Sequence, residues 1–330
     1  MTRLSVLDLA PITEGGSASE SFKNSVEIAQ LAEKLSYKRY WLAEHHNIPG
    51  IASAATAVLL SHVGAQTKTI RIGSGGVMLP NHAPLVVAEQ FGTLASLYPD
   101  RIDLGLGRAP GTDGLTAQAL RRSMSGGVDT FPRDVLELQQ YFSDPERGQR
   151  VQAVPGAGLK VPLWILGSSL YGAELAAHFG LPYAFASHFA PIDLQQALLL
   201  YRQNFKPSAQ LEKPYVMAAM NLQAADTRED ADILVTSLMQ GVLGLVRGMP
   251  VKLPPPVEGF ADTLGPQERA AISRFMTYSA FGDAKDVRER LLEFKAETKA
   301  DEIILTAQIF DHAARLHAFE IAAEAMDFLS

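Results

Sequence analysis

Residues 41–47 read W-L-A-E-H-H-N, a short apolar segment that ends in a glutamate and two histidines. The turn residues Asn47, Pro49 and Gly50 follow directly, so the segment has the form of a strand that stops at a loop. Barrel enzymes place their active sites in the loops that follow the carboxyl ends of their strands, and histidine titrates near neutral pH. The stretch therefore predicts a strand and a candidate site at its end.

Seven further apolar or β-branched runs have the character of strands, and helix-period patterns lie between them. Strand and helix alternate through the whole length, which indicates a parallel sheet of the α/β class. Eight such units favour closure into a (β/α)8 TIM barrel, with an open doubly wound sheet as the alternative. The predicted strands are 6–9, 39–42, 70–73, 102–106, 163–166, 183–186, 216–222 and 303–306.

The length of 330 residues fits one barrel domain over 1–330, with insertions after the fourth and seventh strands. The first insertion, about 143–162, contains several glycines and is expected to form a small hairpin. The second, about 226–283, contains the proline-rich run M-P-V-K-L-P-P-P at 249–256. It is a candidate lid, because loops on this face build the active site, but a helical insertion that packs or mediates dimerisation explains it equally well.

The charge balance limits the partners. The chain has 29 Lys and Arg residues against 36 Asp and Glu residues, a formal net charge of −7. It therefore offers no basic surface for nucleic acid or an anionic membrane, and a small-molecule substrate is expected. The absence of cysteine excludes disulfides, thiolate catalysis and zinc–cysteine sites. No uncharged apolar segment of 18 residues occurs, so we expect a cytoplasmic protein.

Two of the predicted strand ends carry groups suited to proton transfer and to close packing. Glu44 and His45 follow the second strand, where a carboxylate can set the protonation of an adjacent imidazole. The glycine run G-S-G-G at 73–76 follows the third. Such glycines permit a backbone to approach a flat ligand closely, and a bulge or tight barrel corner explains them equally well.

Two further strand ends suggest a phosphate site. The run G-L-G-R-A-P-G at 105–111 lacks the G-x-G-x-x-G spacing of a dinucleotide loop, and Pro110 delays any helix. Its Arg108 suits bidentate phosphate binding, with a structural salt bridge as the alternative. Ser168 and Ser169 precede an alanine-rich helix whose N-terminus can bind an anion, although ordinary N-capping selects the same residues.

Taken together, these segments make the chain resemble the bacterial luciferase family of flavin-dependent monooxygenases, in its single-gene luciferase-like branch. The resemblance covers nearly the whole chain. It implies a TIM barrel, a homodimer, and reduced FMN supplied by a separate flavin reductase to activate O2 for attack on a small organic substrate. The motifs that carry it are A-E-H-H-N at 43–47, G-S-G-G-V-M-L-P-N-H-A-P at 73–84, Y-P-D-R-I-D-L-G-L-G-R-A-P-G at 98–111, and G-S-S at 167–169 leading into A-E-L-A-A-H-F-G-L-P at 173–182.

The resemblance also implies roles for individual residues around the flavin ring. It places Glu44 near the ring and makes His45 the catalytic residue that handles a proton. It implies a non-proline cis peptide bond at Gly75–Gly76 under the isoalloxazine, with Ser74 among the cofactor-binding residues.

For the FMN phosphate, the resemblance assigns Arg108, Ser168, Ser169 and the amides towards Gly172. The luciferase catalytic subunit has a glutamate at the position of Ser168 and a threonine at that of Gly172. The residues here depart from that subunit at both positions, and backbone amides can replace the lost hydroxyl. The reactive cysteine of luciferase is also absent, and light emission is not implied.

Three other functions stay open. The chain can be a deazaflavin-dependent reductase, or a flavin-binding protein without turnover. A metal-dependent hydrolase built on His45, His46, His82 and His188 lacks the H-x-H motif and a carboxylate ligand set, so no metal is expected. The sequence does not identify the substrate, because the loops after strands one, six and seven shape the pocket.

Overall fold

The computed structural model describes residues 2–120 and 130–325. Its strands pair in parallel in the order β6-β5-β4-β3-β2-β1-β9-β7-β8, and a further pairing of β6 with β7 closes the first eight into a ring. The (β/α)8 barrel is thus confirmed, and the open sheet is excluded. The strands are β1 Arg3–Asp8, β2 Arg39–Leu42, β3 Arg71–Met78, β4 Ile102–Gly107, β5 Leu163–Gly167, β6 Tyr183–Phe185, β7 Val216–Ala224, β8 Ser279–Gly282 and β9 Glu302–Thr306.

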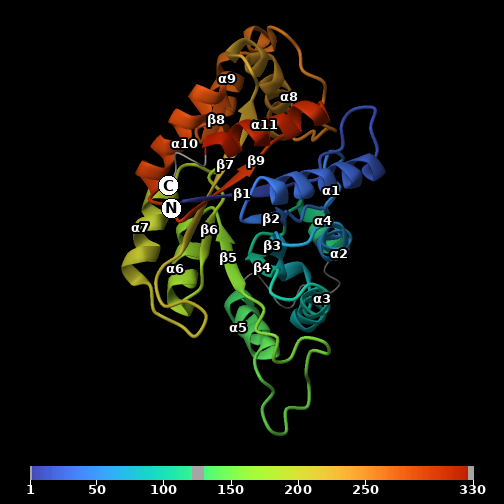
Figure 1. Cartoon of the computed structure of the whole chain (residues 1–330), viewed down its shortest axis with the longest axis vertical. Helices are drawn as coiled ribbons and strands as arrows, with labels where there is room; N and C mark the ends of the chain where they lie inside the picture. The colour runs from blue at the N-terminus through green and yellow to red at the C-terminus, as the bar shows by residue number, and fades with distance from the viewer. Residues whose placement is uncertain (1, 121–129, 326–330) are drawn as a thin grey trace.

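Helices surround this barrel (Figure 1). The helical pattern predicted around Val135 is correct, because Phe131, Val135, Leu138 and Phe142 are all buried on one face of α5. The helices are α1 Ala18–Lys34, α2 Thr56–Gln66, η1 Leu79–Asn81, α3 Pro84–Leu97, α4 Gly114–Leu120, α5 Phe131–Phe142, α6 Leu170–Phe179, α7 Leu194–Asn204, α8 Arg228–Val246, η3 Phe260–Thr263, α9 Pro266–Phe275, α10 Ala284–Thr298 and α11 His312–Glu324.

The third strand is longer than predicted, because the glycine run expected to follow it lies within it. The register between β3 and β4 shifts between Ser74 and Val77, which is a local bulge. A Cβ atom at Gly76 would lie 2.7 Å from the carbonyl oxygen of Gly105. The two strands therefore approach too closely here for any side chain, and glycine is required.

The predicted insertion after β7 is correct in position and consists of α8, η3, α9 and the short strand β8. Strand β8 was not predicted, and it extends the sheet beyond the barrel by pairing with the end of β7 at Asn221–Ala224. Helices α8 and α9 share a small apolar core that includes Leu238 and Ile272. The Leu253 amide donates to the Ile12 carbonyl at 2.9 Å, so the insertion also contacts the loop after β1.

The hairpin predicted at about 143–162 is wrong, because no residue of this interval is in a strand. The interval forms turns that extend beyond α5 at the lower end of Figure 1. Gly156 and Gly158 have φ angles of 156° and 80°, and Pro155 lacks the amide hydrogen that strand pairing needs. Gly92 of α3 packs against the backbone of Pro155, which holds part of the interval on the barrel.

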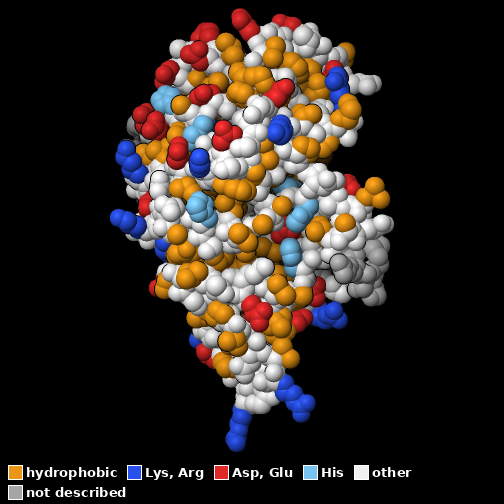
Figure 2. All heavy atoms as spheres, turned by 90° about the vertical axis from the view of Figure 1, so that its right-hand side faces the viewer, with side chains coloured by type: hydrophobic (Ala, Val, Ile, Leu, Met, Phe, Trp, Pro, Cys, Tyr) orange, Lys and Arg blue, Asp and Glu red, His pale blue; other side chains and the backbone are white. Residues whose placement is uncertain are grey.

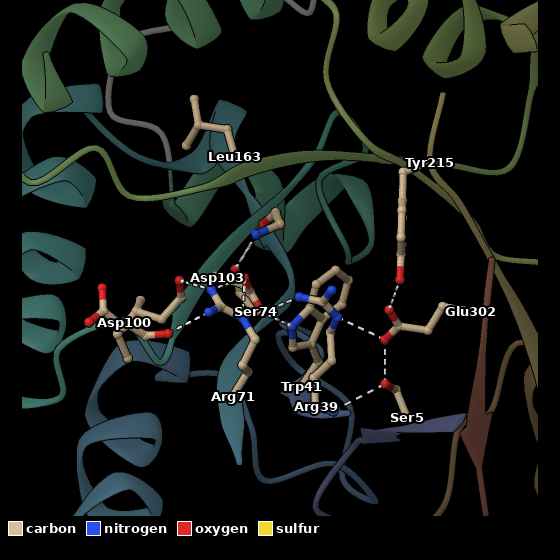
Figure 3. Close-up of polar contacts among 12 residues, drawn as sticks. Ser5, Arg39, Trp41, Arg71, Ser74, Asp100, Asp103, Leu163, Tyr215 and Glu302 are labelled. Carbon is tan, nitrogen blue, oxygen red and sulfur yellow. Dashed lines mark hydrogen bonds and ion pairs between the residues drawn. The ribbon is translucent and has the colours of Figure 1, made fainter. Parts of the chain in front are cut away.

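Ion pairs occupy the end of the barrel interior that lies at the amino-terminal ends of the strands, which we call the floor (Figure 3). Arg39 contacts Asp103 and Glu302 at 2.7 Å each, and Arg71 contacts Asp103 at 2.6 Å. Burial raises the pKa of Asp103, but the two guanidinium groups outweigh it and hold that pKa below its usual value. An apolar layer of side chains that includes Trp41 also packs inside the barrel, so this end is closed. A ligand must therefore enter from the carboxyl ends of the strands.

Within the described residues, none of the helices has both the length and the apolar character needed to span a membrane.

Candidate functional site

The candidate site lies at the barrel mouth, the rim formed where β2, β4 and β5 end at Leu42, Gly107 and Gly167. Figure 2 shows histidine side chains gathered around a recess with much apolar surface. All of the predicted site residues come from β3 or from the segments that follow β2, β4 and β5. Because the strands are parallel, their carboxyl ends meet at one rim, which is why residues far apart in the sequence converge here.

Glu44 is the buried anion of the site. Its Oε1 accepts hydrogen bonds from Nε2 of His46 and Nε2 of His82, both at 2.8 Å, and its Oε2 accepts from the amide of Met78 at 3.1 Å. Burial raises the pKa of Glu44, but these hydrogen bonds and the charge of His82 outweigh it, so that the pKa is lowered. Glu44 is therefore a fixed carboxylate, held by two imidazoles from different strand ends.

His45 is half-buried beside this cluster. Its Nδ1 lies 3.3 Å from the carbonyl oxygen of Gly111, which can only accept, so Nδ1 carries the hydrogen and Nε2 carries the free lone pair. Burial lowers the pKa of His45 below its ordinary value, against the opposing effects of Gly111 and Glu44. His45 is thus a neutral imidazole at pH 7 that can accept a proton at Nε2.

His188 faces the same region from the loop after β6. Burial and the nearby His45 lower the pKa of His188 to about 3, so its ring stays neutral. Its carbonyl oxygen accepts a hydrogen bond from Nδ2 of Asn221 at 2.7 Å. The sequence suggested His188 only as a metal ligand, and the signal for a different role was its position just beyond a predicted strand, like that of His45.

The peptide bond between Gly75 and Gly76 is cis, as the resemblance implied. The Glu44 amide donates to the Gly76 carbonyl at 3.4 Å, so this peptide lies directly beside the Glu44 backbone. Ser74 is buried, and its hydroxyl donates to the Gly105 carbonyl at 2.9 Å and accepts from the Gly105 amide at 3.0 Å. The Ser74 side chain therefore fixes the bulge next to the glycine peptide.

Arg108 lies beside the start of α6. Its guanidinium carbon is 4.1 Å from the ring centre of Tyr171, in the first turn of that helix. Among the described residues Arg108 has no carboxylate within ion-pair distance, so the alternative of a structural salt bridge is not found there. The contact brings the end of β4 to the N-terminus of α6, as a phosphate site requires.

The N-terminus of α6 is open. Ser169 is its N-cap residue, but the Ser169 side chain makes no capping hydrogen bond, so ordinary capping does not explain the serine. Ser168 is half-buried and Ser169 is exposed beside it. Gly172 packs against Tyr183, where a Cβ atom would lie 3.3 Å from that ring. The first turn of α6 thus lacks a side-chain cap and lies with two serine hydroxyl groups beside Arg108.

For the alternative of a metal-dependent hydrolase, the structure shows a possible carboxylate ligand, Glu44, that the sequence did not suggest. The ligand atoms of Glu44, His46 and His82 all lie within 4.8 Å of one another, whereas His45 and His188 do not belong to this group. The four-histidine arrangement is therefore not formed.

The described residues thus combine a closed (β/α)8 barrel with a guanidinium, a helix start and a buried carboxylate–histidine cluster at one rim, the face on which barrel enzymes place their active sites. Residues 2–302 match the family model described as luciferase-like monooxygenase, and the chain belongs to that family. It is 57% identical over 325 residues to a luciferase-like monooxygenase of Escherichia coli strain K12, covering 98% of this chain and 97% of that protein. It is 31% identical over 332 residues to N-acetyl-S-alkylcysteine monooxygenase of Bacillus subtilis strain 168, covering 99% and 98%.

Solved structures share the fold over the whole chain. The structure of apo-MsnO8 is 33% identical, with a TM-score of 0.87 and 99% of both chains covered. The oxygenating constituent of 3,6-diketocamphane monooxygenase from Pseudomonas putida, solved with FMN, is 16% identical with a TM-score of 0.71, covering 98% of this chain and 97% of that one. An F420-dependent secondary alcohol dehydrogenase is 17% identical with a TM-score of 0.71, covering 98% of both. At 16% and 17% identity, the last two structures show only that the fold is shared.

Proposed function

We propose that the protein is an FMN-dependent monooxygenase that uses reduced flavin and O2 to oxidise a small organic substrate. The observation that carries the proposal is Arg108, which stacks on Tyr171 beside the start of α6 and has no ion-pair partner among the described residues. A guanidinium and free helix amides are the donors that a phosphate monoester takes. Family membership supports flavin chemistry at the same rim.

The residues present fit FMN in two places. Arg108, Ser168, Ser169 and the amides towards Gly172 would hold the phosphate. The Gly75–Gly76 peptide would lie under the flat ring, as the resemblance implies. When bound, the flavin supplies the electron-transfer and oxygen chemistry, and the protein supplies position, charge and exclusion of water.

His45 and Glu44 are the residues proposed for the chemical step. The Nε2 atom of His45 accepts a proton during oxygenation, since Nδ1 is committed to the Gly111 carbonyl. Glu44 positions the imidazoles of His46 and His82 and holds a negative charge beside the Gly76 carbonyl. Within this proposal a separate flavin reductase supplies reduced FMN and the protein works as a homodimer, as the resemblance implies, and it does so in the cytoplasm, as the composition indicates.

A deazaflavin-dependent reductase is the second candidate, because the barrel is also shared with an F420-dependent dehydrogenase. Titration of the protein with FMN and with F420, followed by absorbance, decides between the two cofactors. FMN is expected to bind, and binding of F420 alone would contradict the monooxygenase proposal.

The substrate class is tested by oxygen uptake with reduced FMN across aldehydes, ketones, aromatic compounds and thioethers. The thioethers are included because a relative is named N-acetyl-S-alkylcysteine monooxygenase. His45→Ala is expected to bind FMN normally and to lose substrate oxidation, and His62→Ala, at an exposed histidine of α2, is the control. Unchanged turnover in His45→Ala would refute the role of His45. Flavin binding without turnover on any substrate would favour a non-catalytic flavin-binding protein.

A further inference from the structure

A patch of polar side chains crosses three strands on the inner side of the barrel mouth. Asn221 of β7 pairs with Ser279 of β8 on one side and with Thr306 of β9 on the other. Residues paired in this way lie about 4.8 Å apart and point to the same face of the sheet. Ala219 of β7 packs in the barrel interior, and strand alternation places Asn221 and Gln223 on the same inward side. These four residues, Asn221, Gln223, Ser279 and Thr306, form the polar wall.

Most side-chain polar atoms of the polar wall have no hydrogen-bond partner among the described residues. Oγ of Ser279, Oγ1 of Thr306 and both amide atoms of Gln223 are covered from solvent and unpaired within the part of the chain that the structure describes. Gln223 is fully buried. A buried polar atom without a partner destabilises a folded protein, and most such atoms in native structures are paired. Four unpaired atoms on adjoining strands therefore point to a group that binds there.

The polar wall lies across the barrel from the Gly75–Gly76 peptide, which we call the flavin platform. Around the closed ring, β7 is four strands from β3 in either direction, so the wall faces the strand that carries Gly75 and Gly76. Asn221 also holds the carbonyl of His188, whose ring interacts with that of His45. A molecule that contacts the wall thus faces, across the barrel mouth, the strand that carries Gly75 and Gly76.

We propose that the polar wall is the subsite for an uncharged amide group of the substrate, an inference that rests on the proposed function. The wall contains no charged side chain, and His188 beside it is neutral, so it gives no counter-charge to an ionised group. Gln223 presents one donor and one acceptor side by side, which an amide complements with its carbonyl and N–H. Because these atoms are covered from solvent, the proposal requires the Gln223 side chain to turn toward the mouth when the ligand binds.

The binding test uses three probes with eight non-hydrogen atoms each. N-butylacetamide donates and accepts, 2-heptanone only accepts, and 2-methyl-1-heptene does neither. Their dissociation constants are measured by saturation-transfer NMR on the FMN-loaded wild type, on Gln223→Leu, and on the control Gln140→Leu at an exposed position of α5. We expect the wild type and the control to bind the amide about 10-fold more tightly than the ketone, and Gln223→Leu to lose that preference. Equal affinities in the wild type, or a preference that survives in Gln223→Leu, would overturn the proposal.

A second measurement separates this subsite from a structural role. Replacing an unpaired buried amide with an apolar group of similar size is expected to raise the melting temperature of Gln223→Leu by about 2 °C, with FMN affinity unchanged. A lower melting temperature would mean that Gln223 stabilises the fold, contrary to the proposal. If FMN fails to bind even the wild type, the proposed function is wrong, and the subsite proposal that rests on it is wrong too. If FMN binds normally and the three probes bind with equal affinity, only the subsite proposal is refuted.

Discussion

Replacement of Arg108 by alanine is expected to weaken FMN binding while leaving riboflavin binding unchanged. Riboflavin has the same ring and ribityl chain but no phosphate, so only FMN uses the guanidinium. A hydrogen bond to a charged group contributes about 1.5–3 kcal/mol, and the half-buried Arg108 has no competing carboxylate among the described residues. The dissociation constant for FMN should therefore rise about 10- to 150-fold.

The assay is a fluorescence titration of both flavins against the wild type, Arg108→Ala and the control Arg133→Ala, whose side chain is 77% exposed. The control should bind both flavins like the wild type. If Arg108→Ala weakens riboflavin and FMN by the same factor, Arg108 supports the fold of the mouth and does not bind phosphate. If neither flavin is affected, the phosphate lies elsewhere and the reasoning from the Arg108–Tyr171 contact is wrong.

Three further results are expected. Asp103→Asn leaves the buried Arg39 and the half-buried Arg71 short of a counter-charge and should lower the free energy of unfolding in urea by about 3–5 kcal/mol; no change would mean that the floor pairs do not stabilise the barrel. Gly76→Ala places a methyl group 2.7 Å from the Gly105 carbonyl and should cost about 1–3 kcal/mol, whereas Gly114→Ala, with open space around it, should stay within about 0.5 kcal/mol. Because the pKa of His45 is lowered and its neutral form accepts the proton, kcat/KM should rise with pH through an apparent pKa below 6.5 and then level off; a rise centred above 6.5 would contradict that role.

The barrel could be predicted from the sequence because its strands are apolar runs of the expected length, separated by helix-period patterns. Strand β8 escaped prediction because S-A-F-G at 279–282 is short and has no β-branched residue. The hairpin predicted at 143–162 failed for a related reason, since Pro155 and the positive φ angles of Gly156 and Gly158 oppose strand pairing. Local composition thus predicted long regular elements better than short irregular ones.

The candidate site was predictable to the extent that it lies at strand ends. Glu44, His45 and Arg108 could be found from their positions after apolar runs, and parallel strands bring such positions to one rim. The pairing of Glu44 with His82 joins residues 38 positions apart, and the neutral state of His188 depends on its burial and on the nearby His45. Contacts of this kind arise from tertiary packing, which one sequence does not reveal.

The most direct measurement is a crystal structure of the protein with FMN bound. We expect the phosphate within hydrogen-bond distance of Arg108 and of the backbone amides at the start of α6, with the ring over Gly75–Gly76 and facing His45. A phosphate bound away from α6, or a ring outside the barrel mouth, would contradict the proposal that one rim holds both ends of the cofactor.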